Sequence, residues 1–194
     1  MDWLTFISKV IEAIAWPAVV VAVLLYLRKE LPNIVKSLRK LKFKDVELEF
    51  GEAAIALAAE TKRVVPAAKT GITIQGQDEE TVVAKLSTIA ELSPRAAILE
   101  AWLLVEGAAA DLLRNQQSMT TLSANPGPMR IREGLRRAEV LTPPQEAAFE
   151  HLRRLRNEAV HAPDAEFTAA AVASYVQSAV AMAVYLEDIA SRLQ

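Results

Sequence analysis

The N-terminal part of the chain carries hydrophobic residues on every side rather than along one stripe. Residues 13–27 contain no charged side chain and consist largely of valine, leucine and alanine. Extended back to Trp3, the segment reaches the roughly 20 residues that a helix needs to cross a bilayer. Trp3, Trp16 and Tyr26 are of the type found at membrane interfaces. We therefore expect a transmembrane helix in residues 1–30. The alternatives are a buried helix and an amphipathic helix on the membrane surface.

Basic residues follow this apolar segment directly. They are Arg28, Lys29, Lys36, Arg39, Lys40, Lys42 and Lys44. Because lysine and arginine accumulate on the cytoplasmic side of membrane helices, everything after Leu27 is predicted to be cytoplasmic. The pattern indicates a single-pass protein of a bacterial inner membrane. A cleaved signal peptide fits less well, since Asp2 follows Met1 where a basic region is expected, and the small residues precede the apolar run instead of following it.

Residues 31–92 form a connecting region of mixed pattern. In residues 32–44 the apolar positions share one face of a basic helix, which would lie on the anionic inner leaflet or in solvent. Residues 43–50 then alternate, with Val46, Leu48 and Phe50 on one side, which predicts a short β-strand. Such a strand would pair with another subunit or with residues 71–75. Helices are expected over 52–65 and, capped by Asp78, over 79–92.

From Ser93 to the end, the chain predicts a four-helix domain, residues 93–194. Ser93-Pro94 starts a helix that runs to about Arg114, and a loop spans 115–128. A short helix over 129–139 follows, then one from Thr142-Pro143 to about His161. Asp164 is expected to open the last helix, which ends near Leu193. The predicted fold class is therefore mainly α: an N-terminal transmembrane helix, a short β element and a C-terminal bundle.

The last helix also contains an uncharged run, residues 167–186. Its larger apolar residues recur every four positions, as at Val172, Val176, Val180 and Val184. That spacing is typical of a bundle helix with one buried face. A second membrane span is the alternative.

Composition narrows the possible chemistry. The 194 residues include no cysteine and two histidines, His151 and His161. Disulfides, cysteine-ligated metals, thiol nucleophiles and a multi-histidine metal site within one chain are therefore excluded. The glycine-rich motifs that bind phosphates and dinucleotides are missing as well. We expect no metal and no cofactor.

One motif carries candidate chemistry, Arg156-Asn157-Glu158-Ala159-Val160-His161, at the end of the third predicted bundle helix. This pattern resembles the signature of HEPN domains: an arginine, a polar residue, three further positions and a histidine, followed by a long helix. Two features agree with this resemblance: Glu106 lies among apolar residues of the first bundle helix, and the helices run long, short, medium, long. The resemblance covers residues 93–194, about half of the chain. It implies a HEPN-like bundle of a bacterial type that occurs fused to membrane anchors.

The motif suits RNA cleavage without a metal, because RNA supplies its own nucleophile, the 2′-hydroxyl. His161 would carry the proton and Arg156 would stabilise the phosphorane charge. Asn157, on the same helical face as His161, would orient the imidazole or bind RNA, and Glu106 would pair with Arg156. The resemblance further implies that two protomers share one composite site, so we expect a homodimer or a higher homo-oligomer. The predicted function is a toxin or anti-phage endonuclease, with an antitoxin or defence protein as a possible partner.

A structural interpretation of the same residues stays open. Arg156 and Glu106 would then form a salt bridge within the bundle, and His161 would favour the negative end of its helix. The chain would be a non-catalytic, membrane-anchored scaffold for oligomerisation or sensing. His151 is predicted to be a surface residue of its helix.

Arginines crowd the two helices beside the motif: Arg130, Arg132, Arg136, Arg137, Arg153, Arg154 and Arg156. They could track a phosphate backbone. For Arg132, Arg136 and Arg137 we favour pairing with neighbouring glutamates, and we name Arg153 and Arg154 as the candidates for RNA binding. Aromatic residues for base stacking are lacking nearby, so sequence-specific reading of RNA is not expected.

Overall fold

The computed structural model describes residues 3, 7–9, 12, 15–17, 19–21 and 23, and then residues 47–66, 71–116, 127–162 and 165–193. The chain divides into two compact units, Met1–Lys44 and Asp45–Gln194. The described residues of the first unit are helical, and several of its large apolar side chains are exposed. The basic helix expected over 32–44 and the loop residues 117–126 lie outside the described residues.

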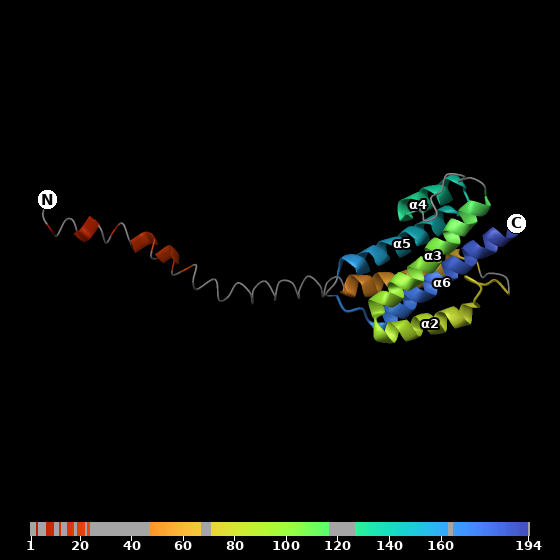
Figure 1. Cartoon of the computed structure of the whole chain (residues 1–194), viewed down its shortest axis with the longest axis horizontal. Helices are drawn as coiled ribbons and strands as arrows, with labels where there is room; N and C mark the ends of the chain where they lie inside the picture. The colour runs from red at the N-terminus through yellow and green to blue at the C-terminus, as the bar shows by residue number, and fades with distance from the viewer. Residues whose placement is uncertain are drawn as a thin grey trace. The chain divides into compact units, whose positions relative to one another are not determined.

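The second unit is mainly helical (Figure 1). Its labelled helices are α2 (Glu79–Leu92), α3 (Pro94–Asn115), α4 (Pro128–Arg137), α5 (Pro143–His161) and α6 (Ala169–Arg192). A further helix over residues 47–64 precedes them. The long, short, medium, long order expected for α3 to α6 is confirmed.

The β-strand predicted over residues 43–50 is wrong for the part that the structure describes. Residues 47–50 belong to the helix described over 47–64, and residues 43–46 lie outside the described residues. Phe50, Ala54, Leu57 and Thr61 form the buried stripe of this helix, at helical rather than alternating spacing. The alternation of Leu48 and Phe50 therefore separates the two faces of a helix, with Phe50 buried and Leu48 exposed.

The β-like residues 72–74 have no distant strand as a partner within the described chain. Ile74 and Gln77 instead exchange both backbone hydrogen bonds, at 2.9 and 3.0 Å, across a two-residue turn. Gln75 and Gly76 both have positive φ, as a hairpin turn of this kind requires.

Local capping signals place most of the helix starts. The Asp78 carboxylate accepts a hydrogen bond from the Thr81 amide, so α2 begins as predicted. Ser93 caps α3, with Pro94 at its first position. The α6 start differs from the prediction: the cap is Thr168, whose Oγ1 accepts from the Ala171 amide, whereas Asp164 lies outside the described residues.

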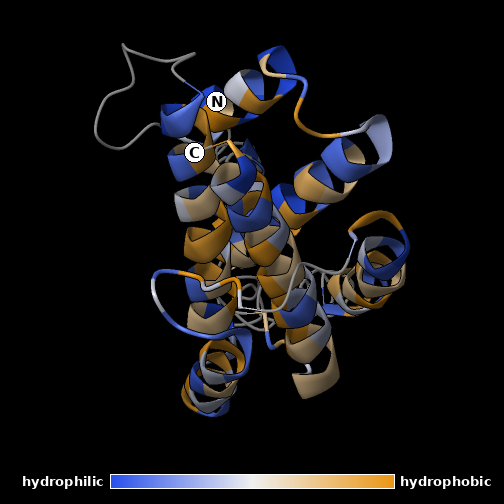
Figure 2. Ribbon diagram, turned by 90° about the vertical axis from the view of Figure 1, so that its right-hand side faces the viewer, coloured by the Kyte–Doolittle hydropathy of each residue, from blue (hydrophilic) through white to orange (hydrophobic). Residues whose placement is uncertain are grey.

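The core lies between α3 and α6, which contact each other more extensively than any other pair of the labelled helices. The two helices run side by side, with α2 along one side and α5 and α4 on the other (Figure 1). Hydrophobic positions gather where the helices face one another (Figure 2). Trp102 of α3 meets Phe149 of α5 at 5.4 Å between ring centroids. Phe50 meets Phe167, just before α6, at 4.6 Å and Tyr175 of α6 at 6.3 Å. These aromatic contacts join the helix over 47–64 and α5 to the α3–α6 pair.

Gln145 is a buried polar residue that connects three helices. Its Oε1 accepts from the Thr142 amide at 2.9 Å, which completes the cap of α5. Its Nε2 donates to the Val64 carbonyl at 3.0 Å and to the Tyr185 hydroxyl at 3.1 Å. The start of α5 is thereby fixed to the end of the helix over 47–64 and to α6.

Among the described residues, one helix is long and apolar enough to cross a membrane, and it is α6. About 61% of its most apolar window is buried within the bundle. The N-terminal segment expected to span the bilayer is described only in part. Most of the apolar side chains of α6 are therefore buried in the bundle, mainly against α3, as their four-residue spacing predicts.

Candidate active site

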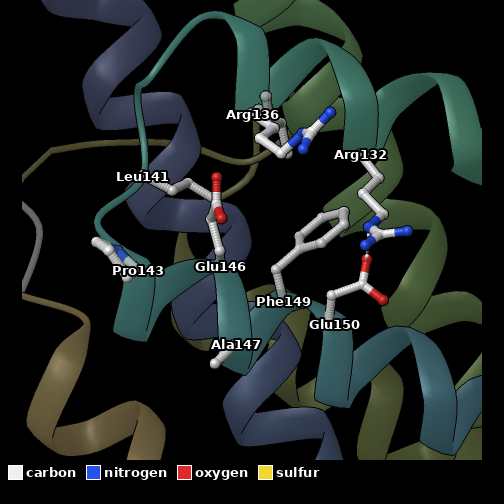
Figure 3. Close-up of a pocket in the computed structure, with 9 residues that line it drawn as sticks. Arg132, Arg136, Leu141, Pro143, Glu146, Ala147, Phe149 and Glu150 are labelled. Carbon is white, nitrogen blue, oxygen red and sulfur yellow. Dashed lines mark ion pairs between the residues drawn. The ribbon is translucent and has the colours of Figure 1, made fainter.

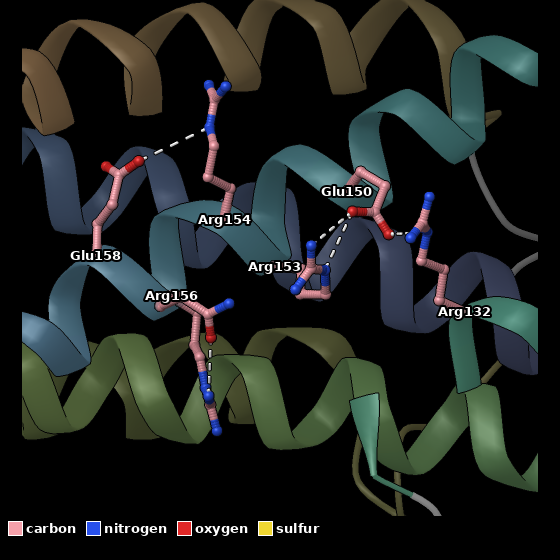
Figure 4. A network of polar contacts seen from close by, with 7 residues as sticks. Arg132, Glu150, Arg153, Arg154, Arg156 and Glu158 are labelled. Carbon is pink, nitrogen blue, oxygen red and sulfur yellow. Dashed lines mark hydrogen bonds and ion pairs between the residues drawn. The ribbon is translucent and has the colours of Figure 1, made fainter. Parts of the chain in front are cut away.

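The Arg/His motif occupies the last two turns of α5. Arg156 extends from α5 toward α3, and its Nη1 donates to the side-chain Oδ1 of Asn157 at 3.0 Å (Figure 4). Both residues are half-buried. The Arg156 Nε is buried and has no hydrogen-bond partner among the described residues. The guanidinium is thus held at one edge by the neighbouring amide.

Glu106 and Arg156 do not form the predicted salt bridge. No ion pair joins them within the described part of the chain, although both act electrostatically on the buried Tyr175 hydroxyl. Burial raises the pKa of Tyr175 far above its ordinary value, which Arg156 opposes and Glu106 reinforces. The hydroxyl donates to the Leu152 carbonyl at 3.2 Å. Glu106 and Arg156 therefore both act on one buried phenol without forming an ion pair with each other.

His161 is exposed and is the last residue of α5. Helical geometry places positions 156 and 161 about 140° apart around the axis, whereas positions 157 and 161 differ by about 40°. Asn157 and His161 therefore share a face, as expected, and Arg156 projects elsewhere. A single chain does not bring Arg156 and His161 to one face of α5.

Sequence reasoning missed Arg95, in the first turn of α3. Its Nη2 donates to the carbonyl of Ala162, the residue that follows His161, and its guanidinium lies 5.8 Å from the Phe167 ring centroid. A positive charge in the first turn of a helix is unfavourable, because it lies at the positive end of the helix dipole. This unfavourable position could have indicated that Arg95 has a partner outside its own helix. Arg95 ties the end of the motif helix to the start of α3.

The two arginines proposed to bind RNA are engaged with glutamates. The Glu150 Oε2 accepts from Nε and Nη2 of Arg153 at 3.1 and 2.9 Å, and its Oε1 lies 2.8 Å from Arg132 Nε (Figure 4). Arg154 Nε lies 3.7 Å from Glu158 Oε1 and is more exposed. The pairing expected for Arg137 is found as well, with Glu133 at 2.7 Å. Arg154 is therefore the more available of the two candidates for a phosphate.

The sequence predicts the other histidine, His151, to be a surface residue of its helix, but it is only partly exposed and has a partner on another helix. His151 is half-buried, with Nδ1 3.6 Å from Glu60 Oε2 of the helix over 47–64, and its Nε2 is buried without a partner among the described residues. His151 and Glu60 border a cavity of about 430 Å³, together with Arg153 and Arg154.

Two further cavities lie on the second unit. One, of about 250 Å³ between α4 and α5, places Phe149 between Arg136, Glu146 and the Arg132–Glu150 pair (Figure 3). The other, of about 620 Å³, is lined by residues of the helix over 47–64, by Glu79 and by α6. None of the three cavities is lined by Arg156, Asn157, His161 or Glu106.

No three His, Asp or Glu side chains come together as a possible metal site in the described ranges. Comparison of the whole chain with protein-family models, with curated proteins and with solved structures finds no match in any of the three.

Proposed function

We propose that this protein is a membrane-anchored, metal-independent RNA endonuclease in which His161 and Arg156 carry the chemistry, acting as a toxin or anti-phage effector. The observation that carries the proposal is the end of α5. An exposed histidine lies there, five residues after an arginine held by the amide between them in sequence, Asn157. The motif resembles the HEPN signature, and helices α3 to α6 follow the long, short, medium, long order expected for a HEPN-like bundle.

The proposed reaction uses the nucleophile of the substrate. The 2′-hydroxyl oxygen forms a bond to the adjacent phosphorus while its proton passes to an imidazole nitrogen. The bond from phosphorus to the 5′ oxygen breaks, and a second imidazole, already protonated, gives its proton to that oxygen. The products are a 2′,3′-cyclic phosphate and a 5′-hydroxyl. A guanidinium stabilises the charge that builds up on the phosphorane oxygens.

Each chain supplies one such histidine. Arg156 and His161 project about 140° apart around α5, so the reaction as written takes groups from two chains. We therefore place the site between two copies, with His161 of the partner subunit as the second proton carrier. Arg154, exposed on the same side of α5 as His161, would contact RNA, whereas Arg153 remains with Glu150.

The proposed anchor is the N-terminal segment, residues 1–30. Trp16, Val19 and Val21 are 68%, 62% and 54% exposed, a concentration of bare apolar surface that a soluble helix rarely shows. Lipid would cover it, and the basic residues after Leu27 would keep the bundle in the cytoplasm. A sodium carbonate wash of membranes tests this: the full chain should stay in the pellet, and its release would overturn the anchor.

The test of the reaction is induction of the full chain in a bacterial host. Cellular RNA should fragment and growth should stop with the wild type and with Val160→Ala, a matched change at the exposed neighbour of His161. His161→Ala and Arg156→Ala should leave RNA intact at equal protein level. Intact RNA with the wild type, or equal cleavage by His161→Ala, would overturn the proposal.

A second candidate function is a non-catalytic scaffold for oligomerisation or sensing. The occupation of Arg132 and Arg153 by Glu150 favours it, because these cations already satisfy an internal partner. In that case RNA stays intact, and the His161→Ala chain behaves as the wild type in every respect.

A further inference from the structure

The helix over 47–64 has two stripes on opposite sides. The inward stripe, Phe50, Ala54, Leu57 and Thr61, is buried against the bundle. The outward stripe consists of Leu48, Glu52, Ile55 and Ala59, which are all exposed. Leu48 and Ile55 are 60% and 55% exposed, although they are the types of residue that a helix normally buries. Within the described part of the chain, nothing therefore covers the outward stripe.

The spacing of the outward stripe indicates what covers it. Its members are separated by four, three and four residues, which is the alternation of a and d positions in a coiled coil. In the sequence, the seven-residue spacing of Ile55 and Leu48 continues toward the N-terminus as Leu41, Ile34 and Leu27. The companion positions 38, 31 and 24 are leucine, whereas position 45 is Asp45. The position that holds Leu48 and Ile55 is thus apolar in five successive heptads of the sequence, a pattern that indicates pairing with another heptad helix.

Charge favours a parallel partner of the same sequence. With Leu48 and Ile55 at d, Lys44 falls at a g position and Glu49 at the following e position. In a parallel pair, these are the positions that attract across the interface. Asp45 and Glu52, both at a positions, would each face the same residue of the other copy, and these like charges weaken the pairing.

We propose that the stripe Leu48, Glu52, Ile55 and Ala59 is a self-association surface, through which two copies of the chain pair in parallel. This surface lies on a different helix from the Arg/His motif. The proposal of this surface does not rest on the proposed endonuclease activity. Its test measures contact between two chains and not RNA cleavage.

The absence of cysteine from the chain allows a direct test by disulfide cross-linking. Membranes from cells that express the full chain with Leu48→Cys or Ile55→Cys are oxidised with copper phenanthroline and separated without reductant. In a parallel pair, each of these cysteines meets its own copy, so both variants should form a dimer band. The yield should exceed by several-fold that of Leu92→Cys, which is 86% exposed at the end of α2 and reports random collision.

A dimer from Ile55→Cys without one from Leu48→Cys would indicate an antiparallel pair, and would overturn the proposal. So would yields no higher than that of Leu92→Cys, or a band at another mass, which would indicate a different protein as the occupant. Glu52→Leu is then added to the Ile55→Cys chain. It removes a like-charge contact from the interface, so the cross-linked fraction should rise several-fold. Misfolding of the variant would not produce such a rise. An unchanged or lower fraction would contradict the parallel register.

Discussion

Asn157 holds the guanidinium of Arg156 through a hydrogen bond of 3.0 Å between Oδ1 and Nη1. The two side chains are adjacent in sequence and both are half-buried. Asn157, the polar residue of the motif, therefore binds Arg156 in addition to sharing a helix face with His161. It fixes the direction in which Arg156 leaves α5.

We predict that Asn157→Ala lowers the rate of RNA cleavage by about 10- to 100-fold. A hydrogen bond to a charged group contributes about 1.5–3 kcal/mol, and each tenfold in rate corresponds to about 1.4 kcal/mol. Asn157→Asp keeps an acceptor for Arg156 and should retain most of the activity. Single-turnover rates of the purified full chain on a generic RNA measure both. Equal rates for Asn157→Ala and the wild type would show that Arg156 does not need this contact.

For Glu106, the lack of an ion pair with Arg156 predicts a small effect on stability. Glu106→Gln should change the free energy of unfolding by no more than about 0.5 kcal/mol. The coupling energy in a double-mutant cycle with Arg156→Gln should also stay below about 0.5 kcal/mol. Urea denaturation measures both values. Loss of one member of a buried salt bridge costs about 3–5 kcal/mol, so a result on that scale would restore the salt bridge predicted from sequence.

Gln145→Ala should be strongly destabilising. The change removes the side-chain bonds to the Thr142 amide, the Val64 carbonyl and the Tyr185 hydroxyl at a buried position. Groups left unsatisfied in the interior cost about 1–3 kcal/mol each, and water can reach some of them, so we expect a loss of about 2–4 kcal/mol. Thermal and urea unfolding measure it. Gln177→Ala, exposed on α6, is the control and should stay within about 0.5 kcal/mol.

Glu187 predicts a pH dependence of stability. Its pKa is raised, first by partial burial and then by the negative charge of Asp111. A carboxyl whose folded pKa lies above its unfolded value of about 4.3 binds protons more tightly in the folded state. Ionisation therefore destabilises the fold, and this penalty disappears as the pH falls through the raised pKa.

Glu187→Gln should consequently be more stable than the wild type at pH 7, by a few tenths of a kcal/mol, the scale of partly exposed charges. The difference should shrink toward pH 4. Melting temperatures at the two pH values measure it, and Glu100→Gln, exposed on α3, reports the effect of the amide exchange itself. If the stability difference between Glu187→Gln and the wild type grew as the pH fell, the pKa of Glu187 would not be raised in the folded state.

Sequence alone determined the helices of the second unit and most of their ends. The bounds of α2, the Ser93-Pro94 start of α3 and the end of α5 at His161 agree with expectation. These features depend on residues within one or two turns, namely side-chain caps, proline at a first position and helical spacing. The face of α6 that packs against the bundle was also readable, because its four-residue spacing is itself a packing pattern.

Tertiary structure decided the rest. Residues 47–50 are helical because Phe50 packs on Phe167 and Tyr175, a contact between distant segments that local alternation cannot express. The same holds for the charges. Arg132 of α4 meets Glu150 of α5, Glu106 forms no ion pair with Arg156 in the described chain, and the partner of His151 is Glu60 on another helix. Composition shows which charged residues are present, but their pairing depends on which helix faces meet in the folded chain.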